Sequence, residues 1–152
     1  MGLIRLQRTA MPSGSVIQTV TKEISGEETT TQNTPQDTAL TLSITPTTAN
    51  SKIFVIASFN GGGSSSSSAF IPSIFRGSTE ITTLGGIYMG TNAAIYGGHC
   101  LSILDSPNTT SSVTYTVKFK LNSGSSTVLF NTNYGGTSQN ERAHLTLMEI
   151  AG

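Results

Sequence analysis

The chain has 152 residues, of which 11% are charged, and its formal net charge is zero. This length suits one domain that folds without disulfides or a structural metal ion. The charged fraction lies well below the ~25% of ordinary domains. The balance argues against a nucleic-acid binder, which needs a cationic surface, and against a polybasic membrane patch. A surface with so little charge tends to self-associate, so we expect sister subunits to cover much of the exterior.

The predicted elements follow from apolar residues at every second position, separated by turn-forming clusters, with no helical period of comparable length. Hairpin spacing of this kind indicates a β-sandwich or a small barrel. We expect residues 1–12 to form a short N-terminal arm and residues 13–152 to form the β-domain. The predicted strands are residues 15–22, 39–44, 52–60, 69–76, 79–83, 99–105, 113–121, 127–131 and 143–150.

Three stretches between these strands are predicted to be loops. Residues 23–38 are acidic and rich in threonine, and residues 84–98 are rich in glycine and expected to be irregular. The GGGSSSSS run from Gly61 to Ser68 is expected to be a flexible loop. It does not match a phosphate-binding loop, because no lysine follows the glycines.

Two predicted strands carry residues that restrict their place in a sheet. Pro72 cannot donate a backbone hydrogen bond, so the strand at 69–76 is expected at a sheet edge or bulged. In the strand at 113–121, Lys118 and Lys120 are expected to face solvent and to discourage edge-to-edge pairing. The residues predicted to face inward in that strand are Val113, Tyr115, Val117 and Phe119.

Cys100 is the single cysteine, so no disulfide can form within the chain. We expect it to be a small buried strand residue. No apolar run near the N-terminus resembles a signal peptide, and no run reaches the ~18 residues of a membrane span. We therefore expect synthesis in the cytoplasm and no membrane insertion.

The two histidines, His99 and His144, are the candidates for acid–base catalysis. Serines are so frequent that a serine near a histidine is weak evidence for a Ser-His-Asp triad. No Gly-x-Ser-x-Gly nucleophile elbow is present. The acidic residues show no obvious pair of the kind that glycoside hydrolysis uses. We expect no catalytic residue, and we expect His144, which alternates with Leu145 and Leu147, at the surface or a subunit interface.

A metal site is not expected either. His99 and Cys100 are adjacent, so on a strand they point to opposite faces and cannot bind one ion together. No calcium-loop spacing is present. Three copies of a histidine gathered on a threefold axis remain an alternative that the sequence leaves open, and no cofactor is expected.

Sugar recognition is the remaining candidate chemistry. Tyr88, Tyr96 and Tyr134 lie in stretches rich in glycine and asparagine, where aromatic side chains are often exposed and functional. Each is either an exposed contact for a host surface glycan or a side chain that packs on its own domain.

Five phrases occur in order from Pro12 to Gly152: PSGSVIQTV, LTLSITPTTANSKIFVIASF, IFRGSTEI, LDSPNTTSSVTYTVKF and LTLMEIAG. Taken together they resemble a family of small β-rich virion proteins and tail-fibre modules of tailed bacteriophages, especially those of marine and cyanobacterial hosts. In that family a first strand follows "GSV-Q" and a "SITP…SSKI" corner leads into a core strand. An "R-G-T-I" hairpin, a "DSP-T…TY-V" turn and a final "MEI" strand follow.

The resemblance implies a jelly-roll-like antiparallel β-sandwich of about eight to nine strands, a homotrimer and a non-enzymatic role in the virion. One placement is a capsid decoration or knob protein on the particle surface. The other is the receptor-binding tip of a tail fibre or spike that recognises host surface glycan. Because no shaft or long adaptor precedes the first strand, we favour decoration, with other capsid or tail proteins as partners.

The N-terminal arm is a further candidate contact. Its apolar residues Leu3, Ile4 and Leu6 alternate with the cations Arg5 and Arg8. We expect either docking on a neighbouring virion protein or a frayed terminus.

Overall fold

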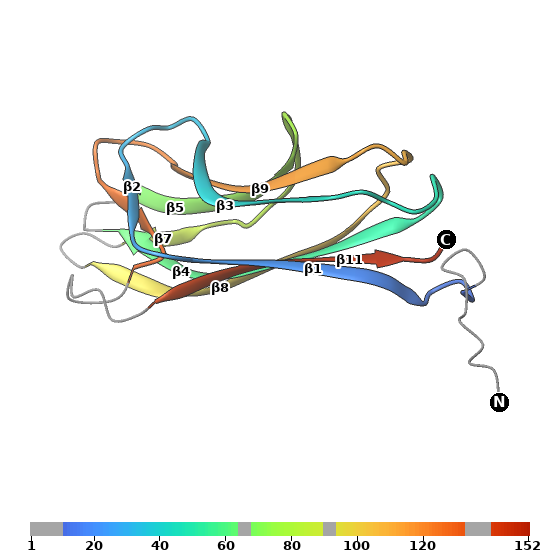
Figure 1. Ribbon diagram of the computed structural model, residues 1–152. Coiled ribbons are helices and arrows are strands. Elements are labelled where there is room, and N and C mark those ends of the chain that lie inside the picture. Colours follow the sequence, from blue (N-terminus) through green and yellow to red (C-terminus); the bar gives the residue numbers. More distant parts are fainter. Residues whose placement is uncertain (1–10, 64–67, 90–93, 133–140) are drawn as a thin grey trace.

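The computed structural model describes residues 11–63, 68–89, 94–132 and 141–152. These residues contain eleven β-strands in two antiparallel sheets, which Figure 1 shows stacked as two layers. The prediction of an all-β antiparallel sandwich is confirmed. No helix in the described residues is long and apolar enough to cross a membrane. The strands are β1 (Val16–Ser25), β2 (Glu28–Thr30), β3 (Gln36–Ile44), β4 (Lys52–Gly63), β5 (Ser68–Arg76), β6 (Thr79–Thr83), β7 (Ile87–Met89), β8 (Ile95–Asp105), β9 (Val113–Leu121), β10 (Val128–Phe130) and β11 (Arg142–Ile150).

The strand order is that of a jelly roll. In the first sheet, sheet A, β8, β4, β11 and β1 lie side by side, and β10 and β2 continue the sheet at the far end of β4. In the second, sheet B, the order is β3, β9, β5 and β6, with β7 also paired to β5. Along the eight longest strands the chain changes sheets at every step except β5 to β6. This connectivity winds two Greek keys into one sandwich.

The core lies between the two sheets and is filled by alternate side chains of each strand. The inward side chains predicted for β9 are buried. Close to Gly61, four phenylalanines and a histidine pack with ring centroids 4.6 to 6.4 Å apart. We call these five rings the aromatic cluster: Phe59, Phe70, His99, Phe119 and Phe130.

The predicted flexible loop at Gly61–Gly63 is instead the last part of β4. These three glycines pair with β8 on one edge and with β10 on the other. A Cβ atom on Gly61 would lie 2.6 Å from the Phe70 ring, and one on Gly63 would overlap the sulfur of Met89. Glycine is therefore needed here for close packing, whereas residues 64–67 lie outside the described residues.

Two other predicted loops also contain strands. Residues 23–38 hold the end of β1, the short strand β2 and the start of β3, while residues 84–98 hold β7 and the start of β8. Strands β2 and β7 each have three residues. Three residues are too few to display an alternation that stands out from the surrounding polar sequence.

The strand that contains Pro72 is not an edge strand. Strand β5 pairs with β9 along one side and with β6 and β7 along the other. Pro72 lies between Ser73, which pairs with β6, and Phe70, which pairs with β7. The residue without an N–H therefore lies between the part of β5 that pairs with β7 and the part that pairs with β6. The pairing of β5 with β6 is itself irregular, with a register shift between Ile74 and Phe75.

Lys118 and Lys120 face outward, as predicted, but they do not protect an edge. Strand β9 lies between β3 and β5 in the interior of sheet B. Lys118 forms an ion pair with Asp37, with 2.7 Å between Nζ and Oδ1, and its ammonium lies 4.5 Å from the centre of the Phe75 ring. The lysine thus covers an aromatic side chain on the outer face.

Candidate functional site

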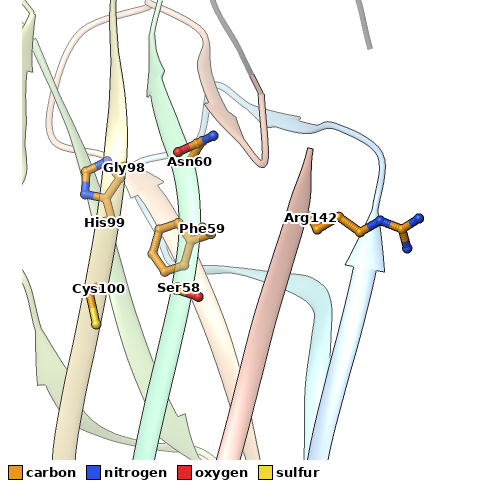
Figure 2. A pocket seen from close by; sticks show the side chains of 7 residues that line it. All are labelled: Ser58, Phe59, Asn60, Gly98, His99, Cys100 and Arg142. Atoms are coloured by element: carbon orange, nitrogen blue, oxygen red, sulfur yellow. The ribbon is translucent and has the colours of Figure 1, made fainter. Parts of the chain in front are cut away.

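A depression of about 370 Å³ opens on sheet A where β4, β8 and β11 lie side by side. Figure 2 shows its lining side chains, with Arg142 extended away from the others. The depression includes the adjacent histidine and cysteine of β8, the pair that sequence analysis weighed for catalysis and metal binding. The lining residues are Ser58, Phe59, Asn60, Gly98, His99, Cys100 and Arg142.

His99 belongs to the core rather than to the solvent-facing side of this depression. Its side chain is 7% exposed and stacks on Phe59, with ring centroids 5.4 Å apart. Its Nε2 lies 3.3 Å from the carbonyl oxygen of Gly61. Burial lowers the pKa of His99 from its ordinary value of 6.5, and the hydrogen bond to Gly61 opposes that shift. The imidazole is therefore a neutral ring of the aromatic cluster, turned away from any molecule bound outside.

Cys100 is exposed, so the prediction that it is buried is wrong. The reason is the alternation along β8: His99 and Leu101 point inward, which turns Cys100 outward, opposite Ser58 on β4. The prediction that His99 and Cys100 point to opposite faces is confirmed. A thiolate–imidazole pair cannot form from this arrangement, because the strand separates the two groups.

Charged side chains along β1 and β11 form the rim next to the depression. Arg142 pairs with Glu23, and Nδ1 of His144 lies 3.7 Å from Oε2 of the same carboxylate. All three side chains are roughly half exposed, and such surface pairs contribute only about 0–1 kcal/mol. His144 is at the surface, as predicted. Among the described residues, no three His, Cys, Asp or Glu side chains form a group that could hold a metal ion.

Of the tyrosines considered for sugar binding, the two in the described residues, Tyr88 and Tyr96, lie on different sheets. Tyr88 lies on β7, and its pairing with Ala69 places it on the outer face of sheet B, where it is 64% exposed. Tyr96 lies on β8, opposite Gly62 on the outer face of sheet A. Its pKa is raised by partial burial and by the nearby charge of Glu27.

The other contact candidates lie outside the described residues. They are Tyr134 and the arm residues Leu3, Ile4, Arg5, Leu6 and Arg8.

A buried polar network joins the two sheets at Asp105, the last residue of β8. Its Oδ2 accepts a hydrogen bond from the hydroxyl of Tyr115 at 2.7 Å, and both carboxylate oxygens lie 2.9 Å from Nη1 of Arg76. Tyr115 is fully buried, and burial followed by the bond to Asp105 raises its pKa. Sheet A is thereby tied to β5 and β9 of sheet B through one carboxylate.

A second network surrounds Glu149, which is fully buried on β11. Gln18 Nε2 donates at 2.6 Å, and Thr47 donates through its backbone N–H at 2.6 Å and its hydroxyl at 3.0 Å. Burial alone would raise the pKa of Glu149, but hydrogen bonds from Ser51, Thr47 and Gln18 lower it. The carboxylate is thus held ionised where β1, β11 and the corner between β3 and β4 meet.

The polar residues of these networks come from the five phrases that carry the phage resemblance. Arg76 lies in IFRGSTEI, Asp105 and Tyr115 lie in LDSPNTTSSVTYTVKF, and Glu149 and its partners lie in the other three. These positions connect segments that are distant in the sequence. The polar residues of the phrases thus hold one end of the jelly roll together.

Sequence analysis missed both networks, although one signal was present. Glu149 continues the inward series of Leu145 and Leu147 at spacing two, so the alternation alone would have placed this acidic residue towards the core. A buried carboxylate requires hydrogen-bond donors. No local pattern indicates which distant residues provide them.

No protein-family model matches the chain, and a search of the curated proteins finds no match. Among solved structures, the chain is similar to one described as the structure of infectious bursal disease virus, Gx strain. The sequence identity is 10%, the TM-score is 0.40 and the match covers 91% of this chain. The chain spans 39% of the length of that viral chain.

Proposed function

We propose that the chain is a non-enzymatic structural protein of a tailed-phage virion, a homotrimeric decoration or knob protein worn on the capsid exterior. The observation that carries this proposal is the position of the five phrases. Their polar residues meet in the two polar networks of a jelly roll, so the residues on which the resemblance rests are also those that hold this fold together. A fold alone does not define function, and the virion role rests on the phrases.

The trimeric state is supported by the composition of the surface. With 11% charged residues, the exterior has few groups that oppose self-association. Sedimentation velocity on the purified chain tests this part directly: a single species of three protomers is expected, and a monomer over the whole concentration range would contradict it.

Labelling of intact phage particles tests the placement. Antibody against the purified chain, viewed by negative-stain electron microscopy, is expected to decorate the head at many positions. Quantitative mass spectrometry of the same particles is expected to give a copy number on the scale of the capsid. Label at the tail alone would overturn decoration in favour of a fibre tip, and absence from the particle would overturn the virion role.

The second candidate is a receptor-binding tip that recognises host surface glycan. The exposed ring of Tyr88 on β7 favours it, because aromatic faces are common contacts for ligands on surface segments. Binding to a glycan array that is lost in a Tyr88→Ala variant would support this candidate. Release of sugar from host envelope would instead identify an enzyme and contradict both proposals.

A further inference from the structure

The outer face of sheet A carries an apolar patch at the end where β1 begins. Its side chains come from four adjacent strands, and Leu104 and Val16 are 51% and 49% exposed. The register of the strands places all of the patch on one face. The apolar patch consists of Val16, Phe54, Ile56, Leu104, Met148 and Ile150.

The centre of the apolar patch is a row that crosses three strands. Phe54 on β4 pairs with Leu104 on β8 at one side and with Met148 on β11 at the other. Ile56 lies two residues further along β4, opposite Ser102 and Thr146. Paired side chains on one face of a sheet are neighbours, so the row forms a continuous apolar strip.

The outer face of sheet B is different and shows that the patch is not a general property of this surface. There the register brings hydroxyl and charged side chains together, such as Thr41 with Thr116 and Asp37 with Lys118. Phe75 on that face is covered by Lys118, and the exposed aromatic ring there, Tyr88, lies apart on the short strand β7. On sheet A, Leu104 and Val16 are about half exposed, and Phe54, Ile56, Met148 and Ile150 are partly buried. Exposed apolar patches commonly mark contact sites.

The dimensions of the apolar patch favour a short segment over a second folded subunit. Three spacings between strands amount to about 14 Å, and three rows of alternate residues cover about the same length. The resulting area of roughly 200 Å² is far below the ~800 Å² that each partner of a stable protein–protein interface contributes.

The residues before β1 form a turn beside one end of the apolar patch. Ser15 N–H donates to the carbonyl of Pro12 at 3.0 Å, and Gly14 between them has a φ of +85°. This is a reverse turn with glycine at its left-handed position. Gly14 N–H also donates to the carbonyl of Ala151 at 2.8 Å, which fixes the turn beside the end of β11.

We propose that the N-terminal segment of the same chain, through Leu3, Ile4 and Leu6, covers the apolar patch. An extended chain spans up to about 3.5 Å per residue, so the five residues from Met11 back to Leu6 reach about 17 Å. The centre of the patch is two to three strand spacings, about 10–14 Å, from β1. A tethered segment has a millimolar effective concentration at this distance. This inference does not depend on the virion role.

Thiol labelling tests the proposal. The reporter is Ser102→Cys in a Cys100→Ser background, because Ser102 is exposed beside Ile56 at the border of the patch. The reporter rate is compared between the native arm and an arm with Leu3, Ile4 and Leu6 all changed to Ser. We expect the apolar changes to raise the maleimide labelling rate about tenfold, as for a docked segment favoured by about ten to one.

Two matched controls accompany this measurement. Arg5→Gln with Arg8→Gln alters the arm without removing apolar groups, and it is expected to leave the reporter rate unchanged. Native Cys100 lies on the same strand and face as Ser102, but outside the patch. Its labelling rate is expected to be the same with the native and the serine-substituted arm. A reporter rate that does not respond to the apolar changes would overturn the proposal.

A disulfide experiment separates the alternative occupants. Leu6→Cys combined with Ser102→Cys, in the Cys100→Ser background, is expected to oxidise within one chain and to run as a monomer on a non-reducing gel. Disulfide-linked dimers would show that the segment belongs to a second copy and would overturn the same-chain assignment. If the reporter cysteine became more protected as the protein concentration rose, and equally so with the native and the serine-substituted arm, the patch would be covered by the β-sandwich of a second copy. That result would also overturn the proposal.

Discussion

The two ends of the sandwich are stabilised in different ways. At the termini end, where β1 begins and β11 ends, the carboxylates of Asp105 and Glu149 gather directed hydrogen bonds from distant segments. At the opposite glycine end, Gly61–Gly63 let neighbouring strands and the aromatic cluster approach closely. Figure 1 shows the start of β1 and the C-terminus at the first end and β2 and β7 at the second. One end depends on polar geometry and the other on the absence of side chains.

This contrast predicts that removing a polar group at the termini end and adding side-chain volume at the glycine end reduce the stability of the fold for different reasons. At the termini end, loss of one acceptor leaves donors unpaired, and for Glu149, whose pKa is lowered, this cost depends on pH. At the glycine end, an added side chain overlaps the Phe70 ring, the Met89 side chain or the backbone of β8, a cost that depends on volume and not on charge. The predictions below test this distinction, beginning with the largest expected effect.

Gly62→Ala is expected to destabilise the fold by about 3 kcal/mol, near the upper end of overpacking costs. The new Cβ would overlap the carbonyl oxygen of Ile95, a backbone atom of the paired strand β8. Urea unfolding at pH 7 measures the change. Gly85→Ala is the matched control, because no atom lies within 4 Å of its Cβ position. Equal stability of the two variants would contradict a close-packed glycine end.

Asp105→Asn is expected to cost about 2 kcal/mol, less than the 3–5 kcal/mol of a fully buried broken pair, because the Arg76 side chain is 32% exposed. Tyr115→Phe removes a single hydrogen bond from the same network and is expected to cost about 1 kcal/mol. The double variant should cost less than the sum, because both changes act on one bond. Full additivity in a urea double-mutant cycle would argue against a shared network.

Glu149→Gln is expected to cost about 1.5 kcal/mol at pH 7, since hydrogen bonds to a charged group are stronger than neutral ones. Its pKa in the folded chain is lowered from the ordinary value of 4.5. The carboxylate therefore contributes stability above pH 4.5, and this contribution is lost as the pH falls through the lowered folded pKa. The difference between native and variant stabilities should shrink between pH 5 and pH 3. A constant difference would contradict the ionised network.

His99→Phe is expected to have the smallest effect, within about 1 kcal/mol at pH 7, because the ring packing is kept and one long hydrogen bond is lost. Burial lowers the pKa of His99 from 6.5, so its neutral form contributes stability above pH 6.5 that is lost as the pH falls towards the folded pKa. The protection factors of the Gly61–Gly63 amides, which correct for the slower intrinsic exchange at low pH, should fall on acidification in the native chain and not in the variant. An equal fall in both would assign the response to another group.

The parts of the fold that could be predicted are those set by local alternation. The bounds of β6 and β9 match the predicted residues, and the inward side chains of β9 follow from their spacing. The glycine end could not be predicted, because the groups that exclude a side chain at Gly61 and Gly63 belong to Phe70 and Met89. Because no local pattern reveals these tertiary contacts, the run of glycines followed by serines was interpreted as a loop.

The candidate site likewise has one feature that could be predicted from the sequence and one that could not. The opposite directions of His99 and Cys100 follow from strand geometry and were predictable, whereas the choice of which side faces the core depends on the neighbouring strands. The same alternation that marks Leu101 as inward would have placed Cys100 outward. The prediction that Cys100 is buried relied instead on the general preference of cysteine for buried positions.

The pairing of the residues before β1 with the residue after β11 has a consequence for engineering. Gly14 donates to the Ala151 carbonyl at 2.8 Å and Ala151 donates to the Ser15 carbonyl at 2.8 Å, so the sandwich begins and finishes at one point. Such a unit can be grafted into a surface loop of a host protein without stretching the host backbone. Cargo attached to β7 or β10 would then be displayed at the tip, on the side remote from the graft.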